Sequence, residues 1–192
     1  VELASKYQMP LRVSSSFRDV PGTLISKEDE SMEQAIISGI AFTRDEAKLT
    51  VTGVKDVPGI AYRILGPVSD GNIEVDMIVQ NTSADQTTDF TFTVQRDDYD
   101  RVMDILQKVV DDIEAGEVQG DAKIAKISLV GVGMRSHAGV ASKMFKVLSD
   151  ESINIQMIST SEIKISVVVD EKYLELAVRA LHSAFELNEE GA

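Results

Sequence analysis

Two stretches of the chain repeat the same order of hydrophobic and polar positions. The first begins near Lys48, where Leu49 and Val51 alternate with threonines as in a strand with one buried face. Apolar residues at helical spacing follow from Ile60 to Val68, then two more alternating runs and a second amphipathic helix. A short strand through Val118 would complete the order β-α-β-β-α-β. We call this stretch the first unit.

The second unit runs from Ile127 to Phe185 and predicts strand, helix, strand, strand, helix. It aligns with the first unit without gaps after the loop that precedes the first helix, since Gly59–Val75 and Gly139–Ile155 have the same length. The second unit ends without a sixth element. The chain is therefore two copies of one design, of which the second lacks its final strand.

Residues Ile36–Phe42 are rich in β-formers and predict a strand that has no partner nearby in the sequence. An unpaired sheet edge is unfavourable, so we expect this strand to complete the sheet of the second unit. The predicted fold class is α+β, with two ferredoxin-like βαββαβ domains and the first inserted within the second.

Composition narrows the functional classes. The 192 residues carry a net charge of −13, with a pI near 4.5, which disfavours nucleic acid and anionic membrane as partners. The chain has no cysteine, no apolar run of membrane-spanning length and no visible signal peptide. We therefore expect a cytoplasmic protein without disulfides.

Motifs for catalysis or metal binding do not emerge. Gly131-Val132-Gly133 precedes a predicted helix, but Ser136 occupies the place of the third glycine of a dinucleotide-binding loop. No phosphate-binding loop or nucleophile elbow is present. His137 and His182 are far apart in the sequence, which disfavours a metal site. We predict no catalytic residues, no metal and no cofactor.

The two glycine-containing loops suggest a different chemistry. Each opens a helix, where free backbone N–H groups can bind a carboxylate. Asp56 lies in the first loop and could receive an ammonium group, so a zwitterion such as a free amino acid would fit. Gln80 ends a strand of the first unit and offers neutral hydrogen-bonding groups for orienting such a ligand, as do the polar residues of Asn154–Ser161 in the second. The alternative is that these are ordinary turns and hairpin ends.

Several segments resemble the C-terminal regulatory region of the aspartate kinase (aspartokinase) family. They are LRVSSSF, ISGIAFTRDEAKLTVTGVKDVPGIA, VDMIVQN, KISLVGVGMRSHAGVASKMF and INIQMISTSEIKISVVV. That region of the family consists of two ACT domains, which are ferredoxin-like effector modules. The resemblance implies a kinase-domain tail and linker over 1–35, a first ACT domain over 44–121, and a second formed by 36–43 plus 122–192.

The resemblance also implies feedback inhibition by threonine, lysine or both, with such an amino acid as the effector. Carried over by position, the effector residues of the first unit are Asp56, Gly59, Ile60, Ala61 and Gln80, with Asn154 and Ile155 contributed by the second. The matching residues of the second unit are Met134, Ser136, His137, Gly139, Val140, Ser159 and Ser161. Ala138 departs from the family, in which many members have proline there.

The implied partners are a second copy of the chain, joined through the ACT domains, and a catalytic aspartate kinase chain. The chain would be non-catalytic by itself, either as an isolated β subunit or as an excised fragment. Two alternatives stay open from the sequence. One is an enzyme complete in itself, which the missing phosphate-binding loop disfavours. The other is a structural dimerisation module that binds no ligand.

Overall fold

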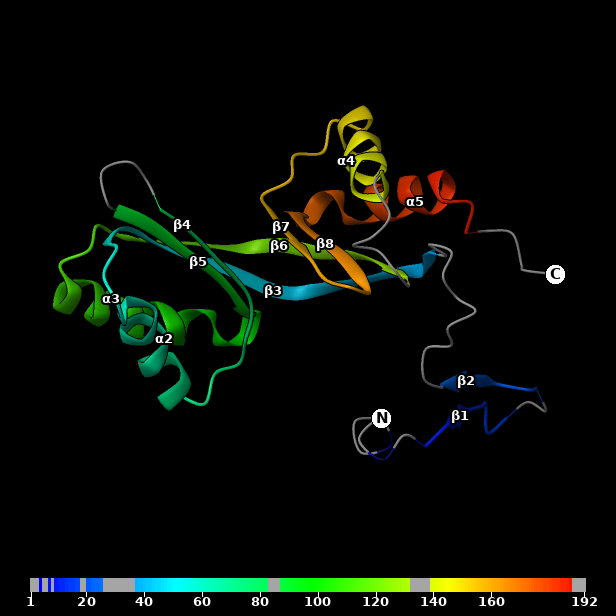
Figure 1. The fold of residues 1–192 in the computed structure, drawn as a ribbon, viewed down its shortest axis with the longest axis horizontal. Coiled ribbons are helices and arrows are strands. Elements are labelled where there is room, and N and C mark those ends of the chain that lie inside the picture. Colours follow the sequence, from blue (N-terminus) through cyan, green and yellow to red (C-terminus); the bar gives the residue numbers. More distant parts are fainter. Residues whose placement is uncertain are drawn as a thin grey trace.

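The fold is described from a computed structural model, which covers residues 4, 7, 9–17, 20–25, 37–82, 87–131 and 139–187. A six-stranded antiparallel sheet has the order β4-β5-β3-β6-β8-β7 (Figure 1). Its strands are β3 (Ile37–Lys55), β4 (Val75–Thr82), β5 (Thr87–Gln95), β6 (Val118–Gly131), β7 (Met157–Thr160) and β8 (Lys164–Asp170). The helices are α2 (Ile60–Asp70), α3 (Tyr99–Ile113), α4 (Val140–Asp150) and α5 (Leu174–Ala184). A separate two-stranded hairpin pairs β1 (Leu11–Val13) with β2 (Thr23–Ile25).

Strands β3 and β6 are shared by both units. The later part of β3 pairs with β5 and with the start of β6, for example Leu49 with Phe92 and Gly120. The earlier part, from Ile37 to Thr43, pairs with Lys126–Gly131 of β6, which itself pairs with β8. The predicted pairing of this early strand with the second sheet is thus confirmed for its described residues, and the first unit is inserted within the second.

The sequence predicted separate strands where the structure has continuous ones. Ile37–Lys55 forms one strand of 19 residues, and Val118 and Ile127 lie on one strand of 14 residues. From the sequence, the polar segment around Arg44 looks like a break between two strands. It instead contains register shifts between Thr43 and Lys48, and such bulges let a strand change its twist without ending.

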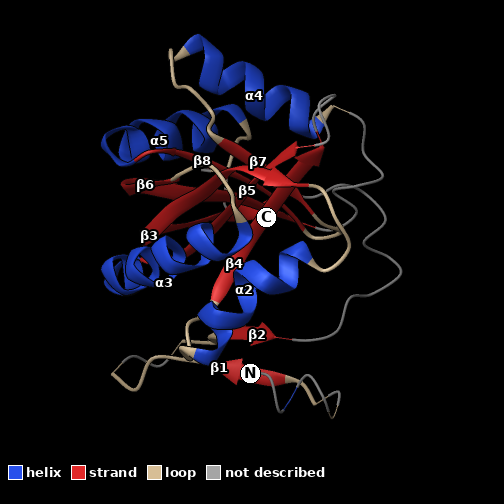
Figure 2. Cartoon of the chain, turned by 90° about the vertical axis from the view of Figure 1, so that its left-hand side faces the viewer, coloured by secondary structure: helices blue, strands red, loops and turns tan. Residues whose placement is uncertain are grey.

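The two helix pairs cover opposite faces of the sheet (Figures 1 and 2). Alternation along β6 explains this arrangement, because successive side chains of a strand point to opposite faces. The even-numbered Val118 and Ala122 pack into the core beneath α2 and α3. The odd-numbered Ala125, Ile127 and Leu129 pack into the core beneath α4 and α5. Each unit therefore has one helix-covered face and one helix-free face.

Each helix contributes an apolar stripe at the spacing that the sequence predicts. In α2 the buried residues are Ile60, Ile64 and Val68, one turn apart. In α5 they are Leu174, Ala177 and Leu181. Among the described residues, no helix is both long and apolar enough to cross a membrane.

The helix-free faces of the two units meet in a small third core. Met77 from the first unit packs there with Ile124, Met157 and Val168. Beside it, the Lys126 ammonium forms ion pairs with Glu46 and with Asp76, and the Lys126 and Glu46 side chains are only 14% and 7% exposed. We call this ion-pair group and the third core the seam between the units.

Candidate functional site

The loop between β3 and α2 ends in a helix start with free donors. Gly59 precedes α2 with a φ of 89°, which favours glycine, and no side chain caps the helix. An added Cβ at Gly59 would meet no atom of the described chain within 4 Å. Ile60 donates its N–H to the Val57 carbonyl oxygen at 3.2 Å. Within the described residues, the next two N–H groups of α2 have no backbone acceptor, and such helix starts can bind a carboxylate.

The second unit repeats this helix start. Gly139 precedes α4 with a φ of 110°, again without a side-chain cap, and an added Cβ would meet nothing within 4 Å of the described chain. Val140 is the first residue of α4 and is half-buried. Met134, Ser136 and His137, which were predicted to complete this loop, lie outside the described residues.

Gln80 reaches the same end and face of the first unit as the Gly59 loop. Both β3 and β4 are antiparallel to β5, so they run parallel to each other and end at the same edge. Gln80 pairs with Phe90, whose side chain faces the α2–α3 core, and paired residues share a face. Asp56 is exposed in the loop at this end, and Ala61 lies in the first turn of α2.

Lys55, the last residue of β3, forms an ion pair near the Gly59 loop. Its ammonium donates to Glu114 Oε2 at 2.6 Å and lowers the pKa of that carboxyl. Because the Lys55 ammonium is paired with Glu114 at the end of α3, it points toward that helix end. The exposed Asp56 carboxylate follows directly in the chain and carries the negative charge of the loop.

Asn154 and Ile155 lie at the opposite end of the second unit from Gly139, just before β7. Ile155 lines a cavity of about 370 Å³ between the two units, whose walls include Lys48, Thr50, Asn81 and Gln156. Asp56, Gly59 and Gln80 do not line it. Within a single chain, this cavity therefore does not join Ile155 to the predicted site residues of the Gly59 loop.

The predicted serines of the second unit fall in two places. Ser159 pairs with Ser166, whose side chain lies on the helix-free face, so Ser159 points away from α4. Ser161 closes the β7–β8 hairpin, where its N–H donates to the Lys164 carbonyl oxygen at 2.8 Å. The position equivalent to Gln80 is Thr160, which pairs with the buried Ile165 on the helix-covered face. The 80-residue offset between Gly59 and Gly139 could have identified Thr160 from the sequence.

The edge strands share a feature that the sequence analysis missed. Ile78 on β4 is 51% exposed and Ile158 on β7 is 46% exposed, and these positions are also 80 residues apart. Both strands are outermost in the sheet. Equivalent exposed isoleucines on two open edges are typical of surfaces that meet another sheet.

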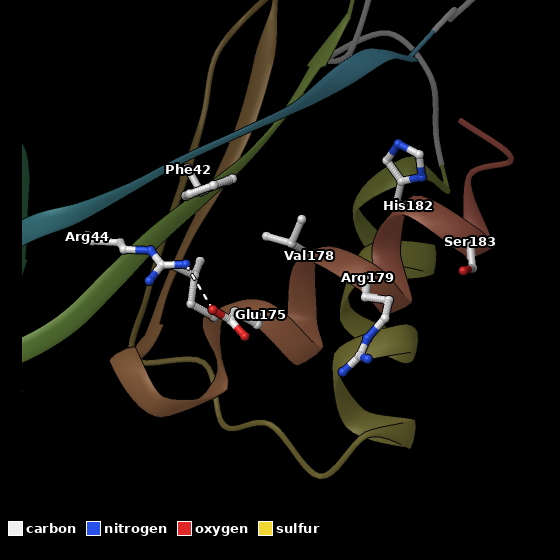
Figure 3. Close-up of a pocket in the computed structure, with 8 residues that line it drawn as sticks. Phe42, Arg44, Glu175, Val178, Arg179, His182 and Ser183 are labelled. Atoms are coloured by element: carbon white, nitrogen blue, oxygen red, sulfur yellow. Dashed lines mark hydrogen bonds and ion pairs between the residues drawn. The ribbon is translucent and has the colours of Figure 1, made fainter. Parts of the chain in front are cut away.

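No group of three or more His, Cys, Asp or Glu residues within the described ranges could hold a metal ion. A further cavity, also of about 370 Å³, lies along α5 (Figure 3). It is separate from both helix starts.

Comparison with known proteins agrees with this architecture. A family model for the ACT domain matches residues 49–110 and 127–185. An aspartate kinase from Pseudomonas fluorescens is 70% identical over 189 residues, which are 98% of this chain and 46% of that protein. An aspartokinase from Corynebacterium glutamicum is 45% identical over 194 residues, or 99% of this chain and 46% of that protein. The chain spans about half the length of the curated relatives it matches.

Two solved structures are matched over nearly the whole length of their own chains. A chain from the structure of aspartokinase alpha and beta subunits is 57% identical with a TM-score of 0.74, covering 78% of this chain and 99% of that one. The ligand-free regulatory subunit of aspartate kinase from Thermus thermophilus is 37% identical with the same TM-score, over 78% of this chain and 99% of that one. The present chain belongs to the ACT-domain family, among the tandem ACT regulatory regions of aspartate kinases.

Proposed function

We propose that this chain is an allosteric regulator of aspartate kinase that binds a feedback amino acid, threonine, lysine or both, between ACT domains. One observation carries the proposal. An uncapped helix start after Gly59 lies at the same end and on the same face of the sheet as Gln80. The free N–H groups suit the carboxylate of an amino acid, Asp56 suits its ammonium, and Gln80 suits a polar side chain.

The complete site uses two chains. Within one chain, Ile155 lines a cavity that Asp56, Gly59 and Gln80 do not line, so a second copy would bring Asn154 and Ile155 to the Gly59 loop. The exposed Ile78 and Ile158 on the two outer strands support side-by-side pairing of β4 from one chain with β7 from its partner. This arrangement makes the homodimer the binding unit. Gly139, Val140 and Ser161 would belong to the equivalent second site, with Thr160 in the position of Gln80 and with Met134, Ser136 and His137 of the preceding loop.

Inhibition follows if the effector prefers one arrangement of the paired domains. Such couplings amount to about 1–3 kcal/mol. The division into a kinase-domain tail and linker over 1–35, a first ACT domain over 44–121 and a second over 36–43 plus 122–192 is part of this proposal. So are a catalytic aspartate kinase chain as partner, the control of aspartate phosphorylation, a place in lysine and threonine biosynthesis, and a cytoplasmic location.

Calorimetry with threonine and lysine, singly and together, tests the proposal. We expect saturable heat with at least one of them. Gln80→Ala should weaken binding about tenfold, because it removes an oriented amide from a ligand held by few polar groups. Gln107→Ala is the matched control, since this exposed glutamine on α3 lies outside the site. No heat with either amino acid would contradict the proposal.

The second candidate function is a dimerisation module without a ligand. The exposed isoleucines on β4 and β7 favour it, because they serve an interface whether or not an effector binds. A melting temperature that does not change with threonine or lysine, in a dimer disrupted by Ile78→Asp, would support this candidate.

A further inference from the structure

At the seam, the two units are related by an approximate two-fold symmetry. Ala47–Val51 of β3 align with Ala125–Leu129 of β6, so Lys48 corresponds to Lys126. Two hydroxyl pairs correspond as well, namely Thr50 with Thr91 at 2.9 Å and Ser128 with Ser166 at 2.7 Å. The surroundings of one lysine can therefore be compared directly with the surroundings of the other.

The two lysines contact equivalent positions of the opposite unit, but these positions differ in charge. Lys126 forms an ion pair with Asp76 of the first unit. Lys48 donates to Gln156 Oε1 of the second unit, and Gln156 lies 80 residues after Asp76 in the aligned repeats. A neutral amide thus occupies the position at which the other lysine has a carboxylate.

The Lys48 ammonium has no ion-pair partner within the described chain, although the residue is half-buried. Glu46, which pairs with the other lysine, has Ile124 as its equivalent at the 78-residue offset of the two lysines. Asp121 lies opposite Lys48 on β6, but its Oδ1 accepts a backbone N–H of its own strand at 2.8 Å. Buried charges are usually paired, so an anion is missing on this side of the seam.

A polar cavity of about 370 Å³ lies at this ammonium. Its walls are Lys48, Thr50, Val79, Asn81, Thr91, Ile155, Gln156, Met157 and Ile158. One of the two paired threonine hydroxyls keeps its own proton for donation, because their mutual bond uses the proton of the other. The amides of Asn81 and Gln156 add further donors, and the ammonium has three protons of which Gln156 accepts one.

We propose that this cavity binds a small oxyanion, phosphate or carboxylate, on the Lys48 ammonium. The anion takes the place that Asp76 has beside Lys126, and its oxygens accept charge-assisted hydrogen bonds from the lysine. The site lies on the helix-free face of the first unit. Val79 lines it, whereas the adjacent Gln80 points to the opposite face of the same strand. The oxyanion site is therefore separate from the proposed effector site.

NMR titration of the chain with sodium phosphate and, separately, with sodium acetate tests the proposal. Sodium chloride keeps the ionic strength constant and serves as the reference anion. We expect saturable shifts in the backbone amides of Lys48–Val51 and of Gln156 with one or both oxyanions. The net charge of −13 disfavours general anion binding, so saturation at these amides reports a local site.

Two variants test the role of the ammonium in different ways. Lys48→Gln should weaken binding about tenfold or more, because the charge-assisted contacts are lost. Gln156→Asp keeps the lysine but supplies the missing carboxylate, so it should weaken oxyanion binding by a similar factor. Lys146→Gln is the matched control, since it removes a cation from the surface of α4. Gln80→Ala should also leave this binding unchanged.

Three outcomes would overturn the proposal. They are no saturable shift at millimolar phosphate or acetate, unchanged affinity in Lys48→Gln or in Gln156→Asp, and shifts confined to the helix starts after Gly59 and Gly139. The last outcome would assign the anion to the proposed effector sites, while loss of threonine or lysine binding alone would leave the oxyanion site intact.

Discussion

At the scale of single residues, Gly59 and Gly139 define the helix starts through backbone conformation alone. Both have positive φ, and neither is crowded, because an added Cβ would contact nothing described within 4 Å. The cost of any other residue at Gly59 is therefore the strain of left-handed backbone and not a clash. This separates the effect of conformation from the effect of packing.

We expect Gly59→Ala to lower the free energy of unfolding by about 1–2 kcal/mol. Gly66→Ala, within α2, should instead raise it by about 0.5–1 kcal/mol, because alanine favours the helix and meets Tyr62 at an ordinary 3.7 Å. Urea denaturation of both variants measures the difference. Equal effects of the two substitutions would contradict the assignment of Gly59 to left-handed backbone.

The candidate site shows how far residue-level prediction could go. Gly59 and Gln80 were predicted together, and the structure places them at one end of the sheet. Ser159 was predicted beside Gly139, yet it points to the helix-free face. The direction of a strand residue depends on its pairing register, and a change of one position reverses it. A polar run such as Ser159–Ser161 does not reveal that register.

At the scale of elements, β3 and β6 show the limit of reading strands from alternation. The alternating runs predicted strand structure in both the early and the late part of β3 and of β6, and the pairing of the early part of β3 as well. Their continuity was not visible, because the residues that connect the runs are charged. Arg44 is tolerated there because it forms an ion pair with Glu175 of α5, and Lys126 because it forms ion pairs with Glu46 and Asp76 at the seam. The alternation of apolar and polar residues indicates which face of a strand is buried, but it does not show whether a charged residue will find an ion-pair partner.

The seam predicts a large effect for a single lysine. Lys126→Ala should lower the free energy of unfolding by about 3–5 kcal/mol, because it leaves the buried Glu46 carboxylate without its cation. The exposed pair of Lys146 and Asp150 is the control, and Lys146→Ala should cost about 0.5 kcal/mol or less. Denaturant unfolding of both variants tests this. A small effect of Lys126→Ala would show that water solvates Glu46 at the seam.

The same lysine predicts a pH dependence. Burial alone would lower the pKa of Lys126, but hydrogen bonds to Asp76 and Glu46 outweigh it and raise the pKa above the ordinary lysine value. The stabilisation is then complete below the unfolded pKa and is lost as pH rises through the folded pKa. Unfolding measured across the alkaline range should show a stability loss that is smaller in Lys126→Met. Identical alkaline slopes would contradict a role for this group.

At the scale of the whole molecule, the shared strands make the two units mechanically continuous. The first core and the second core are separate, but β3 and β6 cross from one to the other. The third core and the Lys126 ion pairs also join the units. Loss of one core should therefore remove strand partners from the other.

This continuity predicts one cooperative unfolding transition. Leu106→Ala in the first core should lower stability by about 2–5 kcal/mol, because Leu106 is fully buried. Hydrogen exchange should then speed up equally in α3 and in α5, although α5 lies in the other unit. Faster exchange confined to α3 would show that the units unfold independently.

Nested strands also have a consequence for synthesis on the ribosome. Residues Ile37–Thr43 emerge first, but their partners Lys126–Gly131 emerge only after the whole first unit. Domains tend to fold as they are made, beginning with the N-terminal one. The inner unit can therefore form while the early strand of the outer one waits with an open edge. That edge includes Ile37, Ile40 and Phe42, so slow translation of the inner unit would prolong the period in which nascent chains can aggregate through it.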